Sequence, residues 1–210
     1  MSTVIAIDGP SGSGKSTVAR GVARELHLEV LDTGAMYRTV TLAALESGTD
    51  ITDADACTAV ARATLDGSGL TGDIRGPEVT AAVSTVSAHP GVREVLVARQ
   101  REWVAQHGGG VVEGRDIGTV VFPKATVKVF LTAGDEERAR RRQQDEAAAA
   151  RDVAVDDVRD AMTRRDAIDS GRAASPLKAA DDAVVMDTTD VDADTVIADI
   201  VARVRAAEGG

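Results

Sequence analysis

Residues 3–17 join a short apolar segment, a glycine-rich loop and the start of a helix, and this combination narrows the possible folds more than any other feature. The loop has the spacing G-x-x-x-x-G-K-S from Gly9 to Ser16. Such glycines let the backbone curl so that successive N–H groups point at phosphate oxygens, and the helix behind the loop favours the same anion. The chain is therefore expected to bind a nucleoside triphosphate.

The loop also supplies side chains suited to that ligand. Lys15 offers a cation to the β- and γ-phosphates, and the Ser16 hydroxyl suits Mg²⁺ held largely through phosphates and water. A chance match is disfavoured because apolar residues recur at helical spacing after the loop, at Val18, Val22 and Leu26. The predicted ATP-binding residues of the loop are Gly9, Pro10, Ser11, Gly12, Ser13, Gly14, Lys15, Ser16 and Thr17.

Composition excludes several other classes of protein. A net charge of −10 argues against a nucleic-acid or membrane-surface binder, because both prefer a basic face. The chain has no asparagine, so the Asn-Lys-x-Asp motif that reads guanine in signalling GTPases is absent. The lone cysteine, Cys57, permits no internal disulfide. With no visible secretory signal or membrane-length apolar stretch, we expect a cytoplasmic protein.

Short apolar segments alternate with helical stretches along most of the chain. The expected strands are Val4–Ile7, Leu28–Leu31, Val111–Glu113, Val127–Leu131 and Val184–Met186. The expected helices are Lys15–Leu26, Ala35–Glu46, Val92–Gln106, Asp135–Ala150, Val155–Arg165 and Asp192–Ala207. This alternation predicts an α/β fold of the P-loop NTPase type: a parallel five-stranded sheet covered by helices on both faces. Its ligands are expected at the carboxyl ends of the strands.

Two regions depart from this rhythm. Residues 34–100 contain a glycine-rich break at 66–77 between helical stretches at Ala54–Leu65 and near Pro77, and they predict a lobe beside the sheet. Residues 135–177 are dense in both charge signs. They fit either a solvated helical face or a mobile basic lid over phosphates.

Arginines gather in four islands, three of which begin at or soon after predicted strand ends. The islands are Leu31–Arg38, Glu113–Thr119, Arg138–Arg142 and Arg164–Arg172. The planar arginine fork holds phosphate oxygens bidentately and keeps its charge. Any one island could be a surface salt-bridge patch, but together they favour anion binding by Arg38, Arg115 and Arg172.

These segments resemble the cytidylate kinases, a family of P-loop nucleoside monophosphate kinases. The matching stretches are residues 7–17, 31–38, 114–123, 136–142 and 165–177, and the resemblance runs nearly end to end. The string Gly-Arg-Asp-Ile-Gly-Thr-Val-Val-Phe-Pro at 114–123 is the specific part. The resemblance implies a single kinase domain: a core of about 1–33, 101–135 and 178–210, a nucleotide-binding insertion of about 34–100, and a lid of about 136–177.

The resemblance also implies roles for individual residues. For CMP they are Thr33, Tyr37, Arg38, Ser84, Arg93, Arg115, Asp116, Arg165, Asp169 and Arg172. Within this set, Ser84, Arg93 and Asp116 read cytosine, Arg165 and Asp169 hold the sugar hydroxyls, and Arg38, Arg115 and Arg172 bind the phosphate. Arg138 and Arg142 would form the lid pair over ATP, and the catalytic set would be Lys15, Arg38, Arg115 and Arg172.

The implied reaction is Mg²⁺-assisted in-line transfer of the γ-phosphoryl group of ATP to CMP or dCMP by a monomer that binds no nucleic acid and no membrane. The CMP phosphate oxygen is already nucleophilic, so positioning and charge neutralisation are expected to suffice. Two departures from the family pattern stand out. The insertion is short around 65–77, and Glu113 occupies a position where aspartate is usual.

Other functions remain open on the residues alone. The runner-up is another small-acceptor P-loop kinase of the adenylate, shikimate or gluconate type. A nucleotide-binding module without turnover would be expected to lack the acceptor-site arginines, which are present here. A nucleic-acid-dependent ATPase is disfavoured by the acidic charge and the four aromatic residues.

Overall fold

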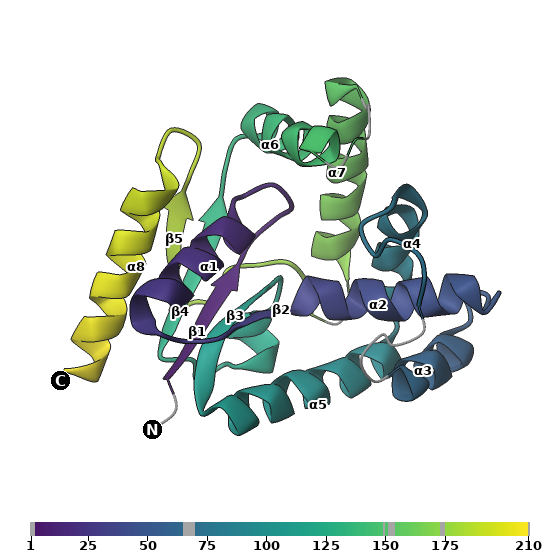
Figure 1. The fold of residues 1–210 in the computed structure, drawn as a ribbon, viewed down its shortest axis with the longest axis horizontal. Helices are drawn as coiled ribbons and strands as arrows, with labels where there is room; N and C mark the ends of the chain where they lie inside the picture. Colours follow the sequence, from purple (N-terminus) through teal and green to yellow (C-terminus); the bar gives the residue numbers. More distant parts are fainter. Residues whose placement is uncertain (1–2, 65–69, 149, 151–153, 173–174, 210) are drawn as a thin grey trace. The chain divides into compact units, whose positions relative to one another are not determined.

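The computed structural model describes residues 3–64, 70–148, 150, 154–172 and 175–209. The strands are β1 (Thr3–Asp8), β2 (Val30–Asp32), β3 (Gly109–Gly114), β4 (Val127–Thr132) and β5 (Val184–Asp187) (Figure 1). The helices are α1 (Lys15–Leu26), α2 (Thr33–Glu46), α3 (Ala54–Ala63), α4 (Pro77–Ala88), α5 (Pro90–His107), α6 (Asp135–Ala148), α7 (Val155–Gly171) and α8 (Ala193–Glu208), with a π-helical turn, η1, at Ile117–Val121.

The chain divides into two compact units. Unit 1 comprises residues 1–31 and 104–210, and unit 2 comprises residues 32–103. Unit 1 contains most of the sheet and the phosphate-binding loop, whereas unit 2 contains α2, α3, α4 and most of α5.

The sheet confirms the predicted fold class. Its five strands are parallel, in the order β2-β3-β1-β4-β5, with helices on both faces. Asp8, the last residue of β1, pairs with Gly114 of β3 and with Phe130 of β4. The chain therefore leaves β1 between two neighbouring strands, which is where open α/β sheets bind their ligands.

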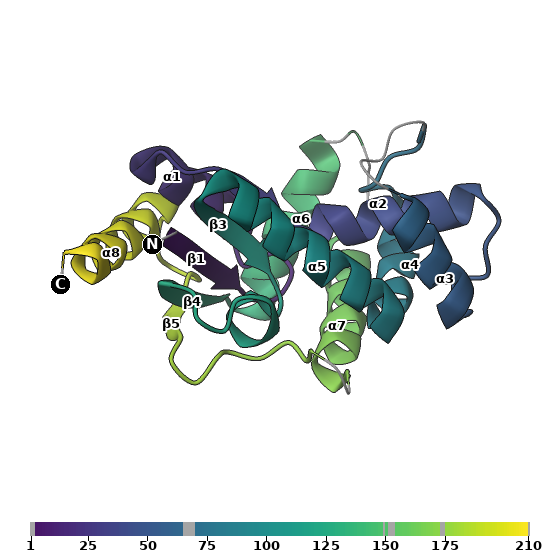
Figure 2. The same ribbon diagram turned by 90° about the horizontal axis from the view of Figure 1, so that it is seen from below.

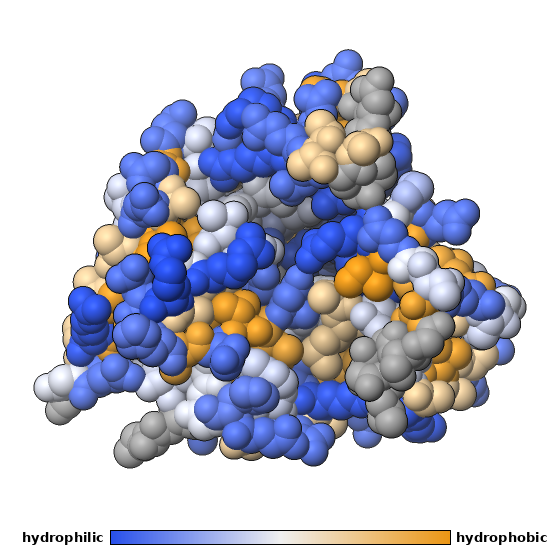
Figure 3. All heavy atoms as spheres, viewed as in Figure 1, coloured by the Kyte–Doolittle hydropathy of each residue, from blue (hydrophilic) through white to orange (hydrophobic). Residues whose placement is uncertain are grey.

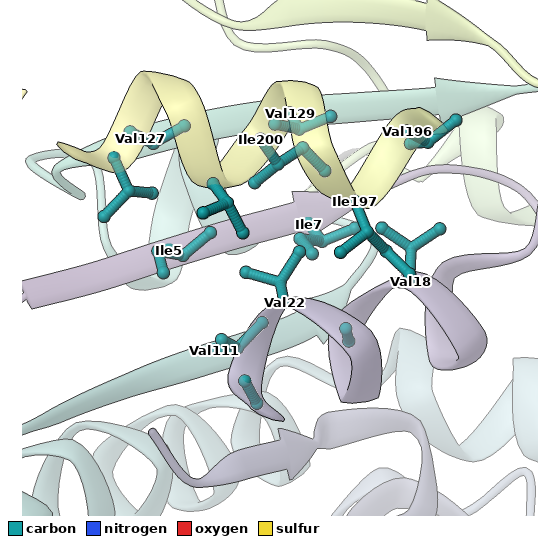
Figure 4. Close-up of a cluster of buried hydrophobic side chains, with 14 of the residues drawn as sticks. Ile5, Ile7, Val18, Val22, Val111, Val127, Val129, Val196, Ile197 and Ile200 are labelled. Carbon is teal, nitrogen blue, oxygen red and sulfur yellow. The ribbon is translucent and has the colours of Figure 1, made fainter. Parts of the chain in front are cut away.

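The core of unit 1 lies between the sheet and helices α1 and α8, which are side by side on one face (Figures 1 and 2). Ile5 and Ile7 of β1 point toward this face and meet Val22 of α1 and Ile200 of α8 (Figure 4). The two helices approach closely because Gly21 has no side chain. A Cβ at that position would lie 2.2 Å from Cδ1 of Ile197.

Unit 2 has a helical core of its own. Its buried apolar residues come from all four helices and are Tyr37, Val40, Cys57, Ala61, Val83, Val86, Val92 and Leu96. Apart from Asp32 at the end of β2, the described residues of this unit contain no strand. Of the shortened stretch at 65–77, residues 65–69 lie outside the described residues, and residues 70–76 form bends and turns.

Most predicted elements are confirmed to within about two residues. The second strand begins at Val30 rather than Leu28, because His27 is left-handed (φ 55°) and the Leu28 N–H bonds back to the Ala23 carbonyl. This closing turn of α1 uses residues assigned to the strand. Helix α7 runs to Gly171 rather than Arg165, so the fourth arginine island is mostly helical. The π-helical turn η1 was not predicted.

The packing of α8 yields a stability prediction. Replacing the fully buried Ile200 with alanine should lower the free energy of unfolding by about 2–5 kcal/mol, because the change removes buried methyl groups and leaves a cavity. Urea unfolding followed by circular dichroism measures this. The control is Arg203→Ala on the same helix, where a half-exposed ion pair with Asp199 should be worth about 0.5 kcal/mol or less. Equal losses in the two variants would contradict this account of the core.

Candidate functional site

The loop after β1 has the curled backbone that phosphate binding requires. Gly9 has φ 147° and Gly12 has φ 75°, both in the region that favours glycine. A Cβ on Gly9 would lie 2.1 Å from the Leu131 carbonyl oxygen, and one on Gly12 would lie 2.7 Å from the Arg138 carbonyl oxygen. Backbone therefore packs against backbone at both positions, and the loop tolerates no side chain there.

Lys15 is buried at the first position of α1, with its charge held against the loop. Its Nζ donates to the Pro10 carbonyl at 2.6 Å and to Oγ of Ser13 at 3.4 Å. Burial lowers the pKa of the Lys15 amine well below its usual range, and the nearby charges of Arg115 and Arg165 act in the same direction. A bound polyphosphate would oppose this effect, because an anion favours the charged amine.

Ser16 and Glu113 form the oxygen pair that suits a magnesium ion. Ser16 Oγ donates to Oε2 of Glu113 at 2.9 Å, which joins the loop to the end of β3. Mg²⁺ prefers oxygen ligands and usually takes only one or two from the protein, with phosphates and waters completing the octahedron. The pair fits that requirement, although the described residues contain no cluster of three or more His, Cys, Asp or Glu that would bind a metal by themselves.

Asp8 was not selected from the sequence, yet it occupies the centre of this edge of the sheet. Its side chain is 4% exposed, and its two carboxylate oxygens accept the N–H groups of Ile117 and Gly118, each at 2.8 Å. Burial raises the pKa of the Asp8 carboxyl to about 6, although the two backbone hydrogen bonds oppose the rise. No local sequence signal could have identified this contact, because it joins residues more than 100 positions apart.

Three predicted acceptor-site arginines converge on one buried carboxylate. Asp169, 1% exposed on α7, accepts from Nε of Arg115 at 3.2 Å and from Nη2 of Arg172, and Nε of Arg165 lies 3.9 Å away. Arg115 comes from the end of β3, whereas the other two come from α7 and the residue after it. The structure therefore brings together four of the residues predicted for CMP.

The predicted lid helix α6 is joined to the phosphate-binding loop. Arg138 donates to the Ser11 carbonyl at 3.1 Å and pairs with Asp135 and Asp166, whereas Arg142 pairs with Glu146 on its own helix. Figure 3 shows a strongly hydrophilic surface over α6. The role of the Arg138–Arg142 pair over ATP stays a prediction.

Arg141, between those two arginines, was missed as a candidate. Its Nη1 and Nη2 donate to Oγ1 and the carbonyl oxygen of Thr188 at 3.0 and 2.6 Å, and Thr188 Oγ1 donates to the Ser13 carbonyl at 3.2 Å. Arg141 thus links α6, the residue after β5 and the loop. The sequence drew attention to the arginine island at Arg138–Arg142, which contains Arg141. Its partner Thr188, however, lies 47 residues away along the chain, and only the fold brings the two together.

Unit 2 carries five more of the predicted CMP residues, all of them buried: Thr33, Tyr37, Arg38, Ser84 and Arg93. Asp116, the last of the set, is buried in unit 1. Arg93 lies over the ring of Tyr37, with its Cζ 5.4 Å from the ring centroid, and Nη1 of Arg93 donates to the Ser87 carbonyl. Ser84 lies one helical turn before Ser87, whose Oγ donates to the Ser84 carbonyl. Nη1 of Arg38 donates to the Ile74 carbonyl at 3.1 Å and to Oγ1 of Thr80 at 2.9 Å.

Thr33 is the first residue of α2, directly after its N-cap Asp32, and it too is buried. Asp32 accepts the Ala35 N–H at 2.9 Å and pairs with Arg75 of the same unit. The interaction with Arg75 ties the segment after the undescribed residues to the start of α2.

Comparison with known proteins agrees with these features. A family model described as cytidylate kinase matches residues 5–206. The chain belongs to the cytidylate kinase family. It is 50% identical over 202 residues to a cytidylate kinase of Mycobacterium avium, covering 90% of this chain and 89% of the relative. It is 49% identical over 217 residues to one from Corynebacterium glutamicum, covering 97% and 94%.

A solved gluconokinase from Sinorhizobium meliloti shares the fold, with a TM-score of 0.54 and 16% identity over 99% of this chain and 95% of that one. At this identity the likeness concerns the fold alone. It does not favour the gluconate-kinase alternative over the cytidylate kinase family. Across the described ranges, no helix combines the length and apolar character needed to cross a membrane.

The raised pKa of Asp8 predicts a pH-dependent stability. The folded state binds the Asp8 proton more tightly than the unfolded chain, so this residue's contribution to the free energy of unfolding should fall as the pH rises from about 4 to about 6. An asparagine does not titrate. Stability of Asp8→Asn relative to the wild type should therefore increase by roughly 3 kcal/mol over that range, since a tenfold change in proton binding is worth about 1.4 kcal/mol.

Urea unfolding of both proteins between pH 4 and 7 measures this difference. Taking the difference cancels the acidic groups that the two proteins share. A difference that stays constant with pH would contradict the raised pKa.

Proposed function

We propose that this protein transfers the γ-phosphoryl group of ATP to CMP or dCMP, giving ADP and CDP or dCDP. One observation carries the proposal beyond family membership. Ser16 of the loop donates to Glu113 of β3, and Arg115, two residues after Glu113, pairs with the same Asp169 carboxylate as Arg172, so cations for a donor phosphate and for an acceptor phosphate share one edge of the sheet. A simple ATPase has no need of the second set.

The donor triphosphate would be held by the loop from Gly9 to Thr17. Backbone N–H groups of the loop and the N-terminus of α1 supply positive ends of dipoles, and Lys15 supplies a full charge. Ser16 and Glu113 would hold Mg²⁺, whose chemistry when bound is to neutralise charge on the phosphate oxygens. Arg138 and Arg142 on α6 are proposed to cover the nucleotide.

The acceptor phosphate would be bound by the arginines around Asp169, and the family resemblance adds Arg38 to the proposed phosphate-binding residues. Three guanidiniums and one carboxylate give the cluster a formal charge of +2, which complements a phosphate monoester of charge about −2. Asp169 keeps the like-charged arginines together before the substrate arrives. The proposed contact of Arg165 and Asp169 with the sugar hydroxyls would be made from the same cluster.

The chemical step needs little beyond positioning. An oxygen of the CMP phosphate attacks the γ-phosphorus, the bond from that phosphorus to the bridging oxygen breaks, and the electrons leave on ADP. That attacking oxygen is already ionised at neutral pH, so no general base is required. Lys15 and the arginines stabilise the charge on the transferring group, and a closed α6–α7 segment would exclude water as a competing acceptor.

Cytosine recognition is proposed for Ser84, Arg93 and Asp116. The base presents an exocyclic amine that needs an acceptor, and N3 and a carbonyl that need donors, which a carboxylate and an arginine can supply. The adenylate, shikimate and gluconate alternatives would have no use for this combination. We further propose that the enzyme acts as a monomer in the cytoplasm, which size-exclusion chromatography with light scattering would test for the oligomeric state.

The proposal is tested by measuring ADP release with CMP, dCMP, UMP and AMP side by side, with shikimate and gluconate as further acceptors. CMP and dCMP should be the best acceptors, and direct detection of CDP by ion-exchange chromatography should match ADP release. Preferential phosphorylation of AMP, shikimate or gluconate, or ADP release that is independent of any acceptor, would overturn the proposed function.

Removing the loop cation should greatly slow the transfer. Lys15→Ala is expected to lower kcat/KM by about 10²–10³-fold, which is the loss typical for deleting a group that stabilises transition-state charge. Steady-state kinetics with CMP and ATP measure it. The exposed Lys124 provides the matched control, and Lys124→Ala should keep wild-type rates. Unchanged turnover in Lys15→Ala would rule out the donor site described above.

Asp116 should affect the choice of base more than the binding of ATP. Asp116→Ala removes the acceptor proposed for the cytosine amine, so kcat/KM for CMP should fall at least tenfold while KM for ATP stays within about twofold. The ratio of kcat/KM for CMP to that for UMP is the measurement. If both nucleotides lose activity equally, Asp116 does not read the base.

A further inference from the structure

We propose that Asp8 is a positioning residue for the acceptor nucleotide: its carboxylate holds the turn that carries Arg115 and Asp116 against the strand that leads into the phosphate-binding loop. The inference rests on the proposed function. It assigns a role to a residue that lies just before the G-x-x-x-x-G-K-S motif and has no part in the proposed function. Asp8 itself is not proposed to touch either substrate.

Asp8 fixes both ends of the segment that contains the two acceptor residues. On one side, Gly114 is the register partner of Asp8 in the pairing of β1 with β3. On the other side, the N–H groups of Ile117 and Gly118 donate to Oδ1 and Oδ2 of Asp8, each at 2.8 Å. Only Arg115 and Asp116 lie between these attachments, so neither residue can shift far without breaking a contact to Asp8.

The turn needs this contact because it cannot supply the same bonds itself. The first N–H groups of any helical segment lack partners within it, and η1 begins at Ile117. Asp116 stands at the N-cap, where aspartate ordinarily accepts those bonds, but it makes no side-chain cap hydrogen bond. Asp8, the last residue of β1, accepts these hydrogen bonds instead. The Asp116 carboxylate is thereby not committed to capping.

The surroundings leave the turn little room to adjust. A Cβ on Gly118 would lie 3.2 Å from Cδ of Lys128 and 3.4 Å from Oδ2 of Asp8, so the turn is packed against β4 as well as against β1. Lys128 is itself buried and fixed, since its Nζ donates to the Pro123 carbonyl at 2.6 Å and to both oxygens of Asp182 at 2.8 Å. Any loosening at Asp8 is therefore expected to move Arg115 and Asp116 rather than Lys128.

The inference is tested with Asp8→Asn in the full-length enzyme. The amide oxygen can accept one N–H, but the amide nitrogen would face the other N–H, so one bond is lost and replaced by repulsion. KM for CMP should rise at least tenfold and the kcat/KM preference for CMP over UMP should fall at least fivefold. The Kd for ATP alone, measured by titration calorimetry at pH 7.5, should stay within about threefold.

A carboxylate of the same type elsewhere provides the control. Asp53 caps α3 by accepting the N–H groups of Asp55 and Ala56, both at 3.0 Å, and it has no proposed part in the site. Asp53→Asn should leave all three quantities unchanged. If Asp8→Asn instead leaves KM and base preference unchanged, or weakens ATP and CMP by the same factor, Asp8 is only a structural buried group and the inference is overturned.

Gly118→Ala covers the case in which Asp8→Asn does not fold. It keeps the carboxylate but pushes the same turn from the β4 side, and it should raise KM for CMP about threefold or more without changing the Kd for ATP. An unchanged KM in this variant would overturn the inference independently. Wild-type protein that fails to phosphorylate CMP would instead overturn the proposed function, so the two failures are distinguishable.

Discussion

Positively charged lysine and arginine side chains lie close together at the carboxyl edge of the sheet, and buried carboxylates make that arrangement possible. Burial lowers the pKa of Lys15 well below its usual range, and repulsion from Arg115 and Arg165 acts in the same direction. Asp169 offsets this repulsion by accepting from or lying beside three arginines, and Glu113 attracts Lys15 while bonding to Ser16. A buried charge without such partners would be too costly to keep. The same cations are the ones proposed to bind phosphate groups, so the proposal links the balance of charge in the fold to the recognition of substrates.

The carboxylates differ in what they hold. Asp169 holds side chains, whereas Asp8 holds backbone N–H groups and thus the path of the chain. Side-chain pairs can exchange for substrate contacts when an anion binds. The bonds to a backbone turn cannot be exchanged without changing the local fold. This contrast is the reason why we propose a binding role for the arginines and a positioning role for Asp8.

The CMP residues proposed for unit 2 are buried in a helical unit. Arg93 packs over Tyr37 and bonds to the Ser87 carbonyl, and Arg38 bonds to the segment before α4. Each of these two guanidiniums donates to a backbone carbonyl oxygen, that of Ser87 for Arg93 and that of Ile74 for Arg38.

The sequence alone determined the strand–loop–helix unit and the parallel sheet, because these depend on local rules, and it predicted the candidate binding residues. Glycine spacing dictates the loop, and apolar runs and helical periodicity dictate most elements. Residues 113–119 showed that charged groups follow a strand, but not how they are held. Only the tertiary structure decided that Asp8 caps a π-helical turn, that Asp169 gathers three arginines and that Arg141 bonds to Thr188. Each of these contacts joins elements distant along the chain, and such contacts exist only once the strands have taken their order in the sheet.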